Sequence, residues 1–84
     1  MPLPSQPVTL TVEQIAELNS KLSTMRHDIN NQLSLIMAAV ELIHHKPQTA
    51  PKMMATLSEQ PPKIASVLVR FSGEFERTFG ITRP

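Results

Sequence analysis

The chain has 84 residues, with 8 Lys and Arg against 7 Asp and Glu, and a formal net charge of +1. This length predicts one small domain. The near-neutral charge and the three aromatic residues, all Phe, argue against a nucleic-acid-binding surface. Cys is absent, which excludes disulfides, so we expect so small a chain to gain stability from oligomerisation or close helix packing, with self-association the simplest route.

The first ten residues predict a flexible leader, because Pro2, Pro4 and Pro7 interrupt a segment with little to pack. Its start, MPLPSQP, lacks the charged and apolar regions of a signal peptide. No apolar run in the chain approaches the roughly 20 residues that span a bilayer. These features predict a cytosolic protein without a membrane partner, whose folded domain covers residues 11–84.

A first helix is predicted over residues 11–45. Thr11 and Gln14 have the spacing of a capping box, and Pro47 follows the end of the helix. Apolar residues recur every three or four positions, which is typical of an amphipathic helix with one narrow apolar stripe. The stripe consists of Ile15, Leu18, Leu22, Met25, Ile29, Leu33, Ile36, Val40 and Ile43.

A loop over residues 46–50 precedes a second predicted helix over residues 51–79. Its stripe has the same spacing, and Pro61 and Pro62 inside it predict a kink or a short break near residues 58–60, where Ser58 could cap the continuing helix. We expect Gly80 to end this helix. The stripe consists of Met54, Leu57, Pro61, Ile64, Leu68, Phe71, Phe75 and Phe79.

Two helices of similar length joined by a short loop predict an all-α antiparallel helical hairpin. A lone hairpin would leave part of each apolar stripe in water. Two copies packed about a twofold axis would bury both stripes, so we expect a homodimer that forms a four-helix bundle.

His27 is the candidate for chemistry, because it projects about 160° away from the apolar stripe. Asn31, one turn later, shares its outward face, and Asp28 and Asn30 flank it on opposite sides. A neutral imidazole is a good nucleophile toward phosphorus. Asp28 could accept the proton of the other ring nitrogen, while Asn31 orients a phosphate oxygen. Asn30 and Arg26 are candidates for binding the phosphoryl group.

The run MRHDINNQLSLIMAAVELI resembles the H-box of the dimerisation and phosphoacceptor domain of sensor histidine kinases. It is especially similar to the variety found in the sporulation initiation phosphotransferase. The resemblance implies that His27 is phosphorylated, that Asp28 is its acid/base residue, and that Asn31 assists transfer or dephosphorylation. It also implies a four-helix bundle made by two hairpins. Gln32 stands where many kinases have a proline, five residues after the phosphoacceptor.

The sequence lacks the Asn-rich and Gly-rich boxes of a kinase ATP-binding domain, since neither of its two glycines lies in a nucleotide loop. We therefore expect phosphate to come from a response-regulator receiver domain, which brings its own Mg²⁺, or from a kinase ATP-binding domain acting in trans. We expect no cofactor on this chain. His44 and His45 point about 100° apart and cannot chelate one ion together, so they are interpreted as helix-end residues and no metal site is predicted.

Two alternatives stay open. One is an adaptor or dimerisation hairpin that binds signalling partners without carrying phosphate. The other is a coiled-coil interaction module unrelated to signalling.

Overall fold

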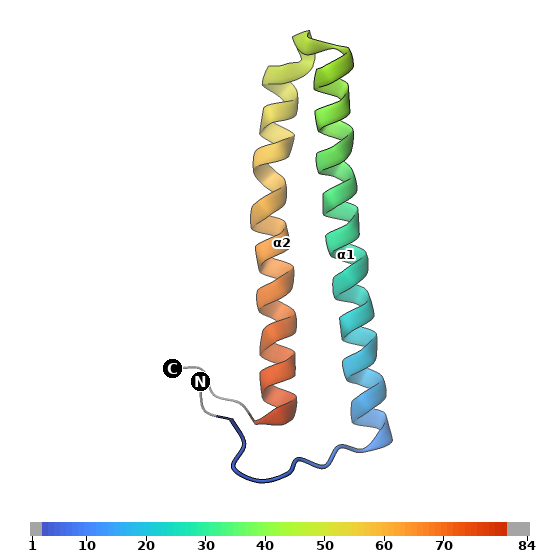
Figure 1. Ribbon diagram of the computed structural model, residues 1–84, viewed down its shortest axis with the longest axis vertical. Helices are drawn as coiled ribbons and strands as arrows, with labels where there is room; N and C mark the ends of the chain where they lie inside the picture. Colours follow the sequence, from blue (N-terminus) through green and yellow to red (C-terminus); the bar gives the residue numbers. More distant parts are fainter. Residues whose placement is uncertain (1–2, 81–84) are drawn as a thin grey trace.

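The computed structural model describes residues 3–80 and contains two long helices. Helix α1 spans Val12–His45, a short 3₁₀ helix η1 spans Pro47–Thr49, and helix α2 spans Ala50–Phe79. Figure 1 shows α1 and α2 side by side and antiparallel, so α2 ends beside the start of α1. The described residues contain no strand. The predicted all-α hairpin is therefore confirmed.

Helix α1 begins where the capping box was predicted. The Gln14 backbone N–H donates to Thr11 Oγ1 at 3.1 Å, and the Thr11 backbone N–H donates to Gln14 Oε1 at 2.8 Å. These two bonds satisfy two backbone donors on one turn, which fixes the start of the helix. At the other end, the Lys46 N–H donates to the Leu42 carbonyl at 2.8 Å before Pro47 turns the chain.

The turn is tied down mainly by Thr49. Its hydroxyl donates to the Lys46 carbonyl at 2.7 Å, and its backbone N–H donates to the same carbonyl at 2.9 Å. Pro51 lies in the first turn of α2, where a missing N–H costs no helical hydrogen bond. The short, fixed turn sets the register in which the two helices pack.

Helix α2 runs without a break through Pro61 and Pro62. The expected break at residues 58–60 is absent, and Ser58 does not cap a new helix, because its hydroxyl donates back to the Met54 carbonyl at 2.9 Å. Both prolines are exposed, so their rings face solvent instead of the interface with α1. Gly80, at φ 66°, ends the helix in the left-handed conformation that glycine adopts without strain.

The interface between α1 and α2 encloses very little of the chain. Only Ala39 and Gln60 are fully buried within the described residues, at 3% and 2% exposure. The side-chain oxygens of Gln32 and Gln60 are buried there without a hydrogen-bond partner in residues 3–80. Around them the facing apolar residues are only half-buried, chiefly Leu22, Met25, Ile29, Ile36, Ile43, Met53, Leu57, Ile64, Val67 and Phe71. A single hairpin therefore has almost no core.

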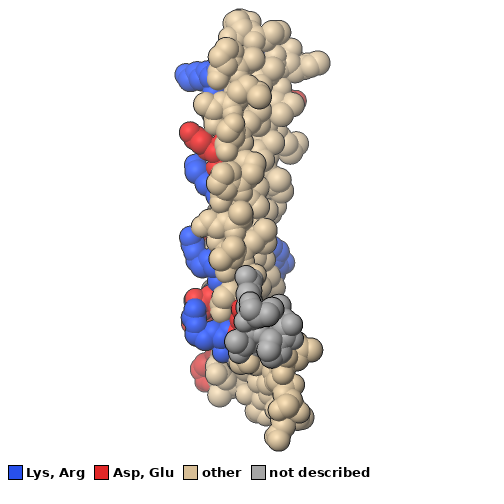
Figure 2. Space-filling model, turned by 90° about the vertical axis from the view of Figure 1, so that its left-hand side faces the viewer, with Lys and Arg blue, Asp and Glu red and all other residues tan. Residues whose placement is uncertain are grey.

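Seven exposed apolar residues form a surface that we call the apolar flank. On α1 it consists of Ile15, Leu33, Met37 and Val40, and on α2 of Met54, Leu68 and Phe75; these are 39–69% exposed. At about 100° per residue, the exposed apolar residues of each helix lie next to those that face the other helix, rotated around the axis in the same sense. Because the helices are antiparallel, this rotation places both sets on one side of the hairpin. Figure 2 shows charged side chains gathered along one edge, with mostly uncharged surface beside them.

No helix in residues 3–80 is long and apolar enough to cross a membrane.

Candidate functional site

His27 lies near the middle of α1 and is exposed. It forms no hydrogen bond, ion pair or ring contact with other residues in the range 3–80. At about 100° per residue it points almost directly away from α2. It leans toward the side of the hairpin opposite the apolar flank. We call this side the polar flank, and on α1 it carries Asn31 and Leu35. The sequence prediction that this imidazole faces solvent is thus confirmed, and both ring nitrogens are open to a reaction partner.

The other predicted site residues surround His27 unequally. Asn31, also exposed, lies one turn later and about 40° around the helix, on the polar flank. Asn30 is exposed about 60° away in the opposite direction, and Arg26 is exposed about 100° away on that same side, toward the apolar flank. The helix therefore brings His27 and Asn31 together, and it separates Arg26 from Asp28.

Asp28 lies closer to α2 than the sequence indicated. It is half-buried and lines a groove between the helices. The reason is that the interhelical contact line is shifted by about 40° around α1 from the centre of the apolar stripe, toward Asp28, Gln32 and the buried Ala39. Ala39 is small, so its side of α1 can approach α2 most closely.

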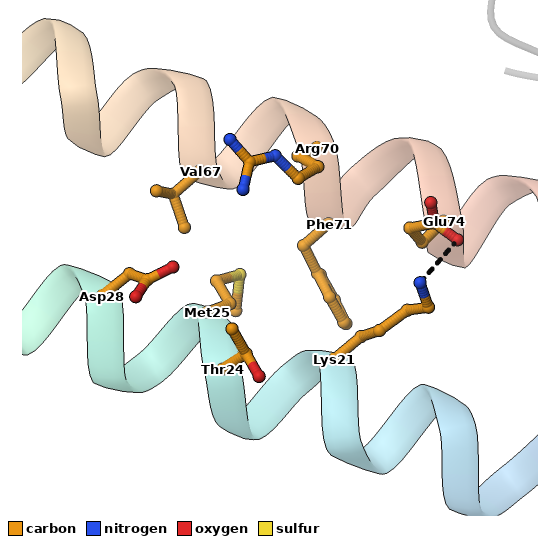
Figure 3. Close-up of a pocket in the computed structure, with 8 residues that line it drawn as sticks. All are labelled: Lys21, Thr24, Met25, Asp28, Val67, Arg70, Phe71 and Glu74. Carbon is orange, nitrogen blue, oxygen red and sulfur yellow. Dashed lines mark ion pairs between the residues drawn. The ribbon is translucent and has the colours of Figure 1, made fainter.

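The groove has a volume of about 190 Å³ and carries two cations and two carboxylates. Figure 3 shows Lys21 and Glu74 joined at one end, with Asp28 and Val67 at the other end and Arg70 above the middle. Its lining residues are Lys21, Thr24, Met25, Asp28, Val67, Arg70, Phe71 and Glu74. The groove thus connects the neighbourhood of His27 to charged residues of α2.

An ion-pair cluster closes one end of the groove. Glu74 Oε2 lies 3.1 Å from Arg77 Nη1 and 3.4 Å from Lys21 Nζ, so it joins α1 to α2. The hydrogen bond from Arg77 lowers the pKa of Glu74 below its usual value of 4.5, with a further contribution from Lys21, although burial acts in the opposite direction. This cluster fixes the register of the two helices at that height.

The lowered pKa of Glu74 predicts a pH-dependent contribution to stability. A carboxyl whose pKa is lower in the folded state stabilises that state above its unfolded pKa, and the benefit disappears as pH falls through the folded pKa. We expect Glu74→Gln to lower the urea midpoint at neutral pH, and the difference from wild type to vanish at a pH well below 4.5. The control is Glu59→Gln, because Glu59 is an exposed carboxylate of α2 without an ion pair in the described residues. It should leave the urea midpoint unchanged at both neutral and acidic pH. A Glu74→Gln effect that persists in acid would exclude this explanation.

The described residues contain no group of three His, Cys, Asp or Glu side chains that could hold a metal ion.

Comparison with known proteins gives no match among family models, curated proteins or solved structures. The site must therefore be interpreted from its own geometry.

Sequence reasoning did not single out Lys21, Arg70 and Glu74. Each alone is an ordinary charged helix residue. Their meeting depends on the register between α1 and α2, which the turn at Thr49 sets and which the pattern within one helix does not contain.

Proposed function

We propose that this chain is a histidine phosphotransfer module of two-component signalling, in which His27 exchanges a phosphoryl group with a response-regulator receiver domain. The observation that carries the proposal is an unpartnered, exposed imidazole in the middle of a long helix, with Asn31 beside it on the same surface. Exposure alone does not distinguish a reactive histidine from an ordinary surface histidine, so the proposal also depends on the H-box-like run around His27.

The reaction is an exchange of one phosphoryl bond for another. A neutral ring nitrogen of His27 attacks the phosphorus of an aspartyl phosphate, a P–N bond forms, the P–O bond breaks, and the aspartate leaves as a carboxylate. Asp28 is the adjacent carboxylate that can accept the proton from the other ring nitrogen. Asn31 can donate its amide N–H to a phosphoryl oxygen. The receiver supplies the Mg²⁺ that neutralises the phosphoryl charge.

Arg26 and Asn30 have smaller roles in this proposal. Both are exposed near His27, but they lie on the side away from the groove. Their rotation around the helix makes them secondary contacts for the phosphoryl group. A phosphorylated receiver, or a kinase ATP-binding domain acting in trans, supplies the phosphate. These partners place the module in the cytosol.

The proposal includes a homodimer that closes a four-helix bundle through the apolar flank. This flank leaves Leu33, Val40, Met54 and Leu68 from 44% to 56% exposed, and such a contiguous apolar surface is typical of an interaction site. His27 lies about 120° around α1 from the flank, so a second copy packed there leaves the imidazole open. The dimer and the receiver would therefore use different surfaces.

The receiver would approach the polar flank. Leu35 lies one turn beyond Asn31, about 12 Å along the helix axis from His27, and is 46% exposed, so it offers an apolar contact on the same flank as the reacting histidine. A mixed polar and apolar surface is typical of a transient protein interface.

The alternative is an adaptor hairpin that binds signalling partners without carrying phosphate. One observation favours it, namely that Asp28 is turned toward α2 instead of standing fully exposed beside the ring. In that case partner binding would not need the chemistry of His27.

The test is to mix the chain with a panel of receiver domains charged with radiolabelled acetyl phosphate in Mg²⁺. We expect at least one receiver to transfer label to the chain, in a form that is lost in acid and stable in alkali, as a P–N bond is. Binding to receivers without any such label would contradict phosphotransfer and favour the adaptor.

A further inference from the structure

Arg70 of α2 is an exposed guanidinium without an ion pair or hydrogen bond to any residue in the range 3–80. It nevertheless lines the groove with the half-buried Asp28. Figure 3 shows its side chain running along α2 toward Val67, away from the ion pair of Lys21 and Glu74. Arg70 therefore lines the same groove as this carboxylate without being bound to it.

A second arginine on the same side of α2 shows what a structural role looks like. Arg77, seven residues later, donates a hydrogen bond to Glu74 and forms an ion pair with it. Its positive charge is thus neutralised within the hairpin. Arg70 has no such contact, so its charge and its planar hydrogen-bonding fork remain available to a partner.

The register places Arg70 level with His27. The contact of Lys21 with Glu74 shows that these two residues lie at the same height in the hairpin. Because the helices are antiparallel, moving four residues back along α2, to Arg70, corresponds to moving four residues forward along α1, to Met25. His27 is two residues further, about 3 Å along the axis. Around α1, Asn31 lies next to His27 on the polar flank, and Asp28 follows at the edge of the groove. Arg70 lines the same groove from α2.

We propose that Arg70 is a positioning residue, which binds the carboxylates or phosphate of an acidic receiver active site as the receiver docks over the polar flank. This rests on the proposed function of His27. A guanidinium binds carboxylate or phosphate through two parallel hydrogen bonds and so fixes orientation as well as attraction. Arg70 lies on the other helix and does not touch His27, so it acts through the partner and leaves the reactivity of the imidazole unchanged.

The experiment uses the full chain with His44→Gln and His45→Gln, so that His27 is its only imidazole. Phosphoramidate charges it directly, since the nitrogen of His27 attacks phosphorus, a P–N bond forms, and ammonia leaves. Receiver domains and Mg²⁺ are then added, and the loss of phosphate from His27 is timed. The compared variants are Arg70→Gln, Arg70→Lys and Arg77→Gln, each checked for unchanged helix content by circular dichroism.

We expect Arg70→Gln to slow transfer to the receiver by about tenfold or more, as for loss of a charged hydrogen bond. Arg70→Lys should restore part of the rate, and Arg77→Gln should stay within about twofold of wild type, because Arg77 is already paired inside the hairpin. Direct charging by phosphoramidate should be the same in all variants. Added salt should shrink the difference between Arg70→Gln and wild type.

Three results would overturn the inference. In the first, Arg70→Gln transfers as fast as Arg77→Gln. In the second, His27 accepts phosphate from phosphoramidate but no receiver removes it. In the third, Arg70→Gln also loses phosphoramidate charging, which would make Arg70 part of a site for small phosphate anions. Failure of His27 to accept phosphate by either route would instead remove the proposed function.

Discussion

The double substitution Leu33→Glu and Leu68→Glu should convert the proposed dimer into a largely unfolded monomer. Each leucine is about half-exposed in the single hairpin, at 46% and 44%, and would be covered by a second copy. Burying a fully exposed leucine contributes about 1.5–3 kcal/mol, and each of these is already about half-buried, so covering the four in a dimer contributes roughly 3–6 kcal/mol. That is a large part of the stability of a small protein.

Light scattering and circular dichroism measure this directly. The wild type should have the mass of a dimer, and its melting temperature should rise with protein concentration, because dissociation and unfolding are linked. The double variant should have the mass of a monomer and should lose most of its helix signal, since the hairpin alone fully buries only Ala39 and Gln60 within the described residues.

Leu35→Glu is the matched control, because Leu35 is on the same helix and has the same 46% exposure as Leu33 but lies on the polar flank. It should remain dimeric and helical. A wild type that stays a stable monomer at high concentration would rule out the four-helix bundle, and equal disruption by Leu35→Glu would show that the apolar flank is not the dimer surface.

The substitution His27→Gln should abolish labelling by phosphorylated receivers, so that the label on the chain falls to less than about a hundredth of the wild-type amount. Glutamine has similar length and can form hydrogen bonds, but its amide nitrogen is not a nucleophile. Because His27 is exposed and unpartnered in the described residues, the change should leave helix content, melting temperature and dimer mass unaltered.

The chain offers two matched controls for this experiment. His44 and His45 are exposed histidines in the last turn of the same helix. His44→Gln and His45→Gln should keep full labelling. Label that survives His27→Gln, or that disappears with either control, would place the reaction on another residue.

Several elements of the hairpin follow from local chemistry, which is why the sequence predicts them. The start of α1 depends on Thr11 and Gln14, its end on Pro47, and the end of α2 on Gly80. Each of these effects involves only neighbouring residues. The exposure of His27 follows in the same way, from its rotation relative to an uninterrupted apolar stripe.

Other features depend on contacts between the helices and are therefore not visible in either helix alone. The pattern of α1 does not show which line along the stripe meets α2, so the half-burial of Asp28 was missed. The pairing of Lys21 with Glu74 needs the register of the hairpin. The unbroken course of α2 depends on Pro61 and Pro62 both facing solvent, whereas proline propensity alone favours a break.

The most direct test of the central claim observes the three histidine rings themselves. Long-range ¹H–¹⁵N NMR of the full chain, recorded before and after addition of a charged receiver and Mg²⁺, reports on the ring nitrogens of each histidine. We expect one ring nitrogen of His27 to shift and gain coupling to phosphorus while His44 and His45 keep their signals. An unchanged His27 ring in a sample that has taken up phosphate would contradict it.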